Sequence, residues 1–172
     1  MPRLFSAKVI LYLCLLILLD WAFLAPFRSA TFQPVLIYLV IPYAAFEWHW
    51  RQALRLSLIV GVLRDVLSSQ PLGVETAVLF TAALAIGFFV QKIERRSWIM
   101  RILAGFIFVY GVSLLVLVIS NLLGFSHQSL WECFALSWAG ALSTVIFLPV
   151  FFYATSMWFG EKFSLRQYEL FK

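Results

Sequence analysis

Residues 102–123 read ILAGFIFVYGVSLLVLVISNLL and contain no charged side chain. A bilayer core about 30 Å thick requires about 20 consecutive apolar residues in a helix, so this run is long enough for one crossing. Five further apolar segments approach the same requirement, at residues 9–27, 32–46, 52–67, 74–90 and 130–159. The pattern predicts an all-α, polytopic membrane bundle of about six transmembrane helices, forming a single domain over residues 1–172.

The composition of the whole chain points the same way. Residues of the set AVILMFWYC make up 63% of the 172 residues, charged residues make up 12%, and the mean hydropathy is +0.96. Soluble proteins carry about a quarter charged residues, and a soluble chain this short cannot bury so many apolar side chains. The composition excludes a soluble enzyme, a nucleic-acid-binding domain and a disordered linker.

Two of the segments depart from a plain helical run. The segment 32–46 is short and contains Pro34 and Pro42, which predict a kinked or tilted helix. The segment 130–159 is longer than one crossing needs, and we expect it to begin with an interfacial turn around Trp131 and Glu132.

The first segment also has features of a signal peptide, since Arg3 and Lys8 precede its apolar run. Cleavage sites need small residues, whereas Phe23 fills a position that should be small and Pro26 follows the best candidate alanine. The sequence therefore favours a retained helix.

Basic residues in short loops report the orientation of a membrane protein. Eleven of the 13 Lys and Arg residues fall on alternating connections and the two ends, whereas the opposite connections hold only Arg28. This bias predicts that both termini face the cytoplasm. The eleven are Arg3, Lys8, Arg51, Arg55, Lys92, Arg95, Arg96, Arg101, Lys162, Arg166 and Lys172.

Ionisable side chains inside predicted segments are costly and indicate function. Asp20 lies about 18 Å beyond Lys8 along a helix, and Arg64 lies about 14 Å beyond Arg55, at similar depth. Arg64 and its neighbour Asp65 point about 100° apart and cannot face each other. We therefore expect an interhelical Asp20–Arg64 ion pair. The alternative is that Arg64 snorkels outward and Asp20 caps a bent helix end.

Gly61, Asp65 and Ser68 share one face of the third predicted helix, just before the turn-like sequence of residues 68–73. A glycine on such a face lets another backbone come close. The Asp65 carboxylate could accept hydrogen bonds from Ser68, Ser69 or nearby backbone amides. The cluster is explained by building the fold at least as well as by binding a ligand.

Small residues recur four apart at Ala83 and Gly87, and again at Ala135, Ala139 and Ser143. Such faces pack closely against another helix, either within the chain or between two copies in a homodimer.

Residues that carry enzyme chemistry are scarce. His49 and His127 lie in predicted loops, and Cys14 and Cys133 lie in apolar stretches without the spacing of metal ligands. The sequence contains no nucleophile elbow, no zinc-binding helix motif and no Gly-rich phosphate loop. We expect no catalytic residue, no metal site and no cofactor.

The stretch Gly61-Val-Leu-Arg-Asp65-Val-Leu-Ser68-Ser-Gln-Pro71-Leu72-Gly73 resembles the most recognisable motif of the MreD family, the membrane subunits of the bacterial rod-shape machinery, or elongasome. That motif reads roughly G-x-x-x-D-x-x-S-x-x-P/T-L-G at the end of the third helix. Chain length, helix number and the early aspartate extend the resemblance over the whole chain. Arg64 is a departure, because the family more often has an apolar residue there.

The resemblance implies a non-enzymatic scaffold of the bacterial inner membrane. Such a protein binds MreC, contacts other membrane proteins of the cell-elongation machinery, and supports peptidoglycan synthesis and cell shape, without a nucleic-acid partner. Pro71, Leu72 and Gly73 lie on the predicted outer side, where we expect them to be structural or near a partner interface.

The family is also similar to the six-helix substrate components of energy-coupling-factor transporters. This likeness implies an alternative function, that of a vitamin-binding transport subunit. Those components carry an Ala-x-x-x-Ala face in helix one, whereas here Ala22 and Ala25 are three apart, which favours the scaffold. An assembly factor of some other complex remains a third interpretation.

Overall fold

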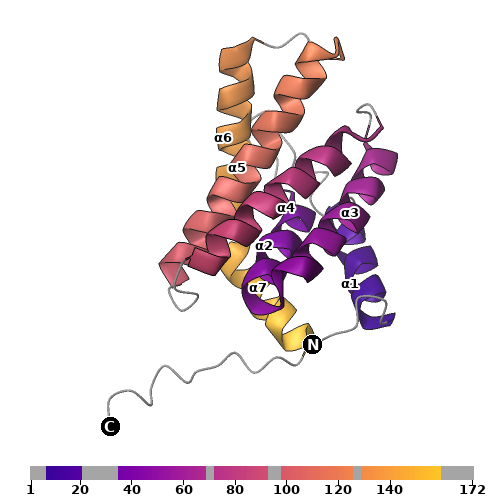
Figure 1. Ribbon diagram of the computed structural model, residues 1–172, viewed down its shortest axis with the longest axis vertical. Helices are drawn as coiled ribbons and strands as arrows, with labels where there is room; N and C mark the ends of the chain where they lie inside the picture. Colours follow the sequence, from indigo (N-terminus) through magenta and orange to yellow (C-terminus); the bar gives the residue numbers. More distant parts are fainter. Residues whose placement is uncertain (1–6, 21–34, 69–71, 93–97, 126–128, 160–172) are drawn as a thin grey trace.

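The computed structural model describes residues 7–20, 35–68, 72–92, 98–125 and 129–159, which form helices and turns without a strand among them (Figure 1). This part of the chain confirms the predicted all-helical class. The helices are α1 (Ala7–Leu18), the 3₁₀ helix η3 (Leu36–Leu39), α2 (Val40–Glu47), α3 (Trp50–Leu67), α4 (Val74–Lys92), α5 (Trp98–Leu122), α6 (Leu130–Ile146) and α7 (Leu148–Phe159).

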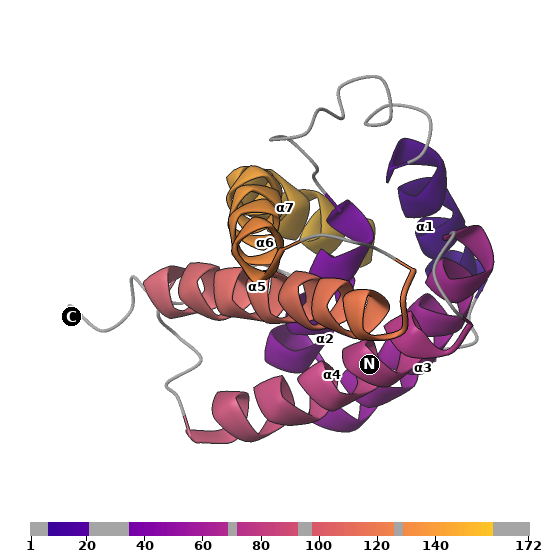
Figure 2. The ribbon, with the colours of Figure 1, turned by 90° about the horizontal axis from the view of Figure 1, so that it is seen from above.

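The short helix α2 forms the centre of the bundle. Every residue from Val40 to Phe46 is buried, and α2 contacts α3, α4 and α5 as well as η3 (Figure 2). At its end the ring of Tyr43 packs edge-on against Trp48 and Phe152, with ring centres 5.8 and 5.2 Å apart. A helix that is apolar on all sides is stable only where its neighbours cover every face.

Pro42 accounts for the irregular start of this element. A proline has no N–H to donate to the carbonyl four residues earlier, here that of Tyr38. The chain accordingly passes from the 3₁₀ helix η3 into α2 just before the proline. Residues 21–34, which include Pro34 and the end of the first predicted segment, lie outside the described residues.

Two helical hairpins pack around α2. One is formed by α3 and α4, the other by α5 and α6, and α4 also packs on α5 (Figure 1). The end of α7 returns to α1, where the hydroxyls of Tyr12 and Thr155 are hydrogen-bonded. The fold thus brings the two ends of the described chain together.

The predicted segment 130–159 differs from the structure, which divides it into α6 and α7, bent by 49°. The cause is Pro149 in the first turn of α7, because its ring clashes with the carbonyl of the preceding turn and removes a donor. The interfacial position expected for Trp131 and Glu132 stays a prediction. These residues form the first turn of α6, where the Glu132 carboxylate and the Ser129 hydroxyl accept each other's backbone N–H groups.

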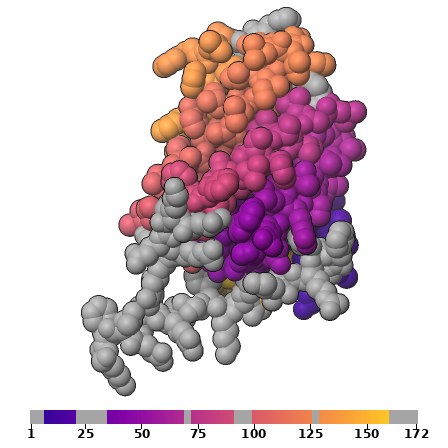
Figure 3. Space-filling model, viewed as in Figure 1, coloured from indigo at the N-terminus to yellow at the C-terminus, as the bar shows by residue number. Residues whose placement is uncertain are grey.

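By length and composition, α5 is able to cross a membrane, and the α6–α7 pair qualifies as a second crossing if the bent pair counts as one. Three other apolar helical stretches are shorter: 7–18, 36–47 and 74–90. Large apolar side chains are exposed on every long helix. In the space-filling view the atoms of α4, α5 and α6 form adjoining parts of one face (Figure 3). They include Ile10, Leu11, Val62, Val66, Phe88, Phe89, Ile107, Leu122, Trp138, Val150 and Tyr153.

The two small-residue faces have different positions. Ala83 is fully buried, and Gly87 packs against the Trp50 side chain of α3, so this face is internal. On α6, Ser143 is buried and donates to the carbonyl of Gly140. Ala135 is exposed and Ala139 half-buried. Of these five small residues, Ala135 and Ala139 keep exposed surface.

Two glycines of α5 provide a test of this packing. A methyl group added at Gly105 would meet the buried side chain of Leu148, whereas one added at Gly111 would have no atom within 4 Å. We expect Gly105→Ala to destabilise the protein by about 1–3 kcal/mol through overpacking.

Gly111→Ala is the matched control, which we expect to be neutral or stabilising by up to about 1 kcal/mol because alanine favours a helix. Thermal unfolding of the purified protein in detergent measures both changes. Equal melting temperatures for the two variants would contradict the α5–α7 contact.

Candidate functional site

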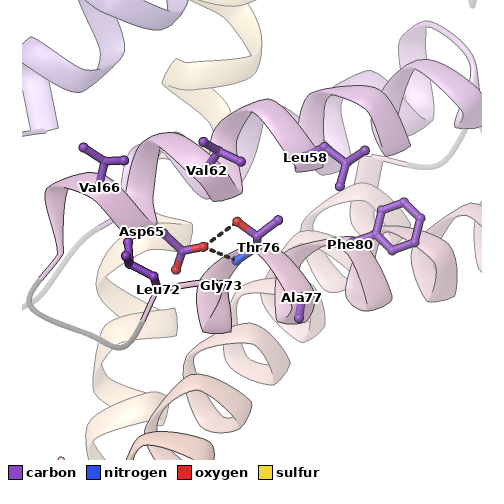
Figure 4. Close-up of a pocket in the computed structure, with 9 residues that line it drawn as sticks. All are labelled: Leu58, Val62, Asp65, Val66, Leu72, Gly73, Thr76, Ala77 and Phe80. Carbon is purple, nitrogen blue, oxygen red and sulfur yellow. Dashed lines mark hydrogen bonds between the residues drawn. The ribbon is translucent and has the colours of Figure 1, made fainter.

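Asp65, near the end of α3, holds the beginning of α4. Its Oδ1 accepts the backbone N–H of Glu75 at 2.9 Å, and its Oδ2 accepts the backbone N–H of Thr76 at 3.1 Å and the hydroxyl of the same threonine (Figure 4). The first backbone N–H groups of a helix have no partner within it, and a carboxylate there also interacts favourably with the helix dipole. Asp65 is therefore an N-terminal cap supplied by a neighbouring helix.

Gly61, one turn before Asp65, allows the two helices to approach this closely. A Cβ atom at Gly61 would lie 2.5 Å from the Cα of Thr76. Since the obstacle is backbone, it cannot move aside without shifting α4. The sequence predicts that Gly61 lets another backbone come close, and the structure shows this approach to α4. It also predicts that Asp65 accepts nearby backbone amides, and the structure shows those of Glu75 and Thr76.

The turn between α3 and α4 contains the rest of the predicted motif. Ser68 ends α3, and its N–H donates to the carbonyl of Arg64 at 2.7 Å. Gly73 has a φ of +92°, in the left-handed region that favours glycine. The Leu72 side chain is 80% exposed. Pro71 lies outside the described residues, so its predicted role remains a prediction.

Arg64 joins two carboxylates from different helices. Its Nε lies 3.0 Å from Oε2 of Glu75 on α4, and its NH1 lies 3.8 Å from Oδ2 of Asp20, just after α1. The guanidinium also stands 5.4 Å from the centre of the Tyr38 ring. Its side chain is 21% exposed, so it lies largely within the bundle.

The two carboxylates have further roles in the same cluster. Glu75 also accepts a hydrogen bond from the Tyr38 hydroxyl at 3.1 Å, and Asp20 accepts the backbone N–H of Leu36 at 3.4 Å. Both acids and Tyr38 are buried. We call Asp20, Tyr38, Arg64 and Glu75 the charged cluster; it ties α1, η3, α3 and α4 to one another.

Sequence reasoning missed Glu75, Thr76 and Tyr38. The sequence did contain a signal for Glu75, which is an acidic residue at the start of the apolar segment 74–90. This end of the segment follows the turn after Arg64, so the two side chains could be expected to lie close together. Thr76 and Tyr38 carried no such signal, because a threonine or a tyrosine in an apolar helix is common and only the packing of α4 and η3 on α3 gives each its partner.

The structure also locates the residues that could carry metal or thiol chemistry. Among the described residues there is no group of three or more His, Cys, Asp or Glu side chains arranged to hold a metal ion. His49 precedes α3 as its N-cap residue, Cys133 is buried, Cys14 is exposed, and His127 lies outside the described part of the chain. The polar groups of the charged cluster and of the Asp65 cap contact one another and the backbone.

A shallow groove of about 420 Å³ lies beside the cap, which we call the α3–α4 groove. Leu58, Val62 and Val66 form its wall on α3, and Ala77 and Phe80 form its wall on α4 (Figure 4). Leu72 stands at the end near the turn, and Asp65 and Thr76 line it between the helices. The groove offers an almost wholly apolar surface to whatever covers it.

Comparison with known proteins identifies a family. The model of a family described as rod shape-determining protein MreD matches residues 2–157. No curated protein and no solved structure matches the chain. The likeness to transporter substrate components thus remains a prediction.

The cap provides a test by substitution of Asp65. We expect Asp65→Ala to cost about 1–2 kcal/mol for the lost cap, and more because two buried N–H groups lose their acceptor. Asp65→Asn keeps one acceptor oxygen and should cost less. Thermal unfolding in detergent measures this order; an alanine variant as stable as the wild type would show that α4 needs no cap from α3.

The charged cluster provides a second test, by double-mutant cycles. Because Arg64 is closer to Glu75 than to Asp20, the coupling free energy of Arg64→Gln with Glu75→Gln should exceed that with Asp20→Asn. Breaking a buried pair from one side costs about 3–5 kcal/mol, so each single variant should lose stability. Additive effects of Asp20→Asn and Arg64→Gln would mean that this pair does not interact.

Proposed function

The chain belongs to the MreD family of rod shape-determining proteins, and on this premise we propose that it is a non-enzymatic scaffold of the bacterial cell-elongation machinery. It binds MreC in the inner membrane and supports peptidoglycan synthesis and the maintenance of cell shape. The transport-subunit alternative is set aside, since the family match covers nearly the whole chain.

The surface of the described helices supports a membrane location. Apolar side chains such as Val66, Phe89 and Val150 are more than half exposed, and similar ones cover every long helix. Exposed apolar patches of this extent mark surfaces that meet a membrane or another protein. In this proposal the bundle crosses the membrane six times, with α6 and α7 as one broken crossing, and the bias of the basic residues favours both termini in the cytoplasm.

One observation supports the scaffold function most directly: some residues of the motif are buried between α3 and α4, whereas others are exposed at the surface. Gly61 and Asp65 are occupied by the contact with α4. Leu72 and the α3 wall of the α3–α4 groove, formed by Leu58, Val62 and Val66, are exposed and apolar. The polar part of the motif builds the fold, and its apolar part is free for a partner.

The proposed orientation places this groove next to the outer membrane surface, because the α3–α4 turn lies on the side opposite to the basic connections. MreC is membrane-anchored with an extracytoplasmic part, so its chain passes through this region. An apolar membrane segment lying along Leu58, Val62 and Val66, which follow one another at intervals of four residues, would bury that exposed ridge.

Leu72→Ser tests the proposed interface. Burial of one leucine contributes about 1.5–3 kcal/mol, so we expect this change to reduce the recovery of co-purified MreC about tenfold or more. Leu122→Ser is the matched control, because Leu122 is 81% exposed and Leu72 is 80% exposed. It should leave recovery unchanged, at equal abundance of both variants.

Loss of MreC with Leu122→Ser and retention with Leu72→Ser would move the interface to the end of α5. Retention in both variants, together with retention in Val62→Ser and Val66→Ser, would exclude the α3–α4 groove as the binding surface.

A further inference from the structure

The beginning of α3 carries two exposed arginines, Arg51 and Arg55, which we call the arginine pair. Residues four apart on a helix are neighbours, with Cβ atoms about 5–6 Å from each other. Within the described residues, neither arginine has an ion-pair partner. The two guanidinium groups are therefore available to one anion at the same time.

The acidic side chains of the surrounding bundle are engaged elsewhere. Glu47 comes four residues before Arg51, but it pairs with Arg101 of α5. The first turn of α3 contains no acidic residue. The carboxylates of the charged cluster and of the Asp65 cap lie at the other end of α3. The positive charge of the arginine pair is thus not compensated by the described part of the chain.

This placement of charge is unfavourable for the helix itself. A cation near the N-terminus of a helix opposes the helix dipole, and like charges four residues apart repel each other. An anion bound by the arginine pair would offset both effects. Stability of the fold therefore does not explain why two arginines stand here, whereas binding of an anion does.

Neighbouring side chains hold the arginine pair in position. The Cζ atom of Arg51 lies 5.7 Å from the centre of the Trp50 ring, within the range of a cation–π contact. Trp50 is half-buried, and a Cβ atom at Gly87 of α4 would lie 3.5 Å from its Cβ. Because α4 fixes Trp50, the guanidinium of Arg51 is oriented before a ligand arrives, which lowers the entropic cost of binding.

The residues that follow on the same face of α3 indicate which kind of anion fits. At about 100° per residue, Leu58 and Val62 lie within about 60° of the arginine pair around the helix axis. Leu58 is 43% and Val62 55% exposed. The face thus changes from charged to apolar within one turn, and Trp50 stands at the charged end, where membrane interfaces favour tryptophan. A phospholipid has the same order, an anionic headgroup followed by apolar chains.

We propose that the arginine pair binds the headgroup of an anionic phospholipid in the cytoplasmic leaflet. Guanidinium groups bind phosphate oxygens through paired hydrogen bonds, and basic residues at the cytoplasmic boundary attract anionic headgroups. The acyl chains of the lipid remain in the bilayer. This inference rests on the membrane location and orientation proposed above and does not depend on binding of MreC.

Native mass spectrometry of the purified full-length chain in detergent tests this assignment with two lipids that share the same acyl chains. These are phosphatidylglycerol, which is anionic, and phosphatidylcholine, which has no net charge. We expect the wild type to retain phosphatidylglycerol in preference. Arg51→Gln and Arg55→Gln should each weaken this retention about fivefold, and the double variant on the order of 25-fold.

Lys8→Gln is the matched control, since it removes one exposed positive charge at the start of α1, on the same predicted side of the membrane. It should leave lipid retention unchanged. Melting temperatures report on the fold: without lipid, the double variant should melt no lower than the wild type, because two unfavourable charges are gone. Added phosphatidylglycerol should raise the melting temperature of the wild type more than that of the double variant.

Co-purified MreC, measured on the same samples, separates this inference from the proposed partner function. Lost lipid with MreC retained supports the inference, whatever the outcome for Leu72→Ser. Lost MreC with lipid retention unchanged would instead assign the arginine pair to an acidic segment of that partner.

Three further results would overturn the inference. Equal retention of the two lipids by the wild type would remove the headgroup selection. Undiminished retention of phosphatidylglycerol in the double variant would place the lipid elsewhere. A loss with Lys8→Gln as large as that with Arg55→Gln would mean that total positive charge, and not the arginine pair, attracts the lipid.

Discussion

The acceptance of two backbone N–H groups of α4 by the Asp65 carboxylate is the contact on which the rest of the bundle depends. An N–H group without a hydrogen-bond acceptor is costly in a low-dielectric interior. Because the Asp65 carboxylate accepts these two N–H groups, it fixes where α4 begins relative to α3. Gly61 lets the two backbones meet at that register. Because α4 begins at this position, the Glu75 carboxylate lies next to the Arg64 guanidinium, and the charged cluster forms.

Polar groups elsewhere in the described part of the chain serve the same purpose. The N–H groups at the start of η3 are accepted by side chains from other helices: that of Val35 by the hydroxyl of Thr144 at 3.1 Å, and that of Leu36 by Asp20. Irregular backbone is tolerated at membrane depth only where neighbouring elements satisfy it in this way. The breaks near Pro42 and Pro149 are thus part of the packing, since η3 packs on α1 and α7 is hydrogen-bonded to it.

This use of polar groups separates the interior of the protein from its outer surface. The charged cluster and the Asp65 cap hold four elements together, and a charge that already has a buried partner is a poor candidate for chemistry on a substrate. The surface outside is largely apolar, and it includes the α3–α4 groove near the motif and a second groove between α4 and α5, with Ala85 and Gly111 among its lining residues.

Composition and periodicity determined the helical class, the approximate positions of the apolar segments and the shared face of Gly61, Asp65 and Ser68, because these follow from local hydropathy and from residue types at fixed spacing. The importance of the full motif from Gly61 to Gly73 came from its resemblance to the MreD family. The predicted partner of Arg64 was Asp20, chosen by depth. The structure adds Glu75 at a shorter distance, since only the crossing of α3 and α4 brings that side chain inward. The division of residues 130–159 into two helices and the two grooves likewise depend on how distant helices pack. A linear sequence does not contain those contacts, whereas tertiary structure creates them.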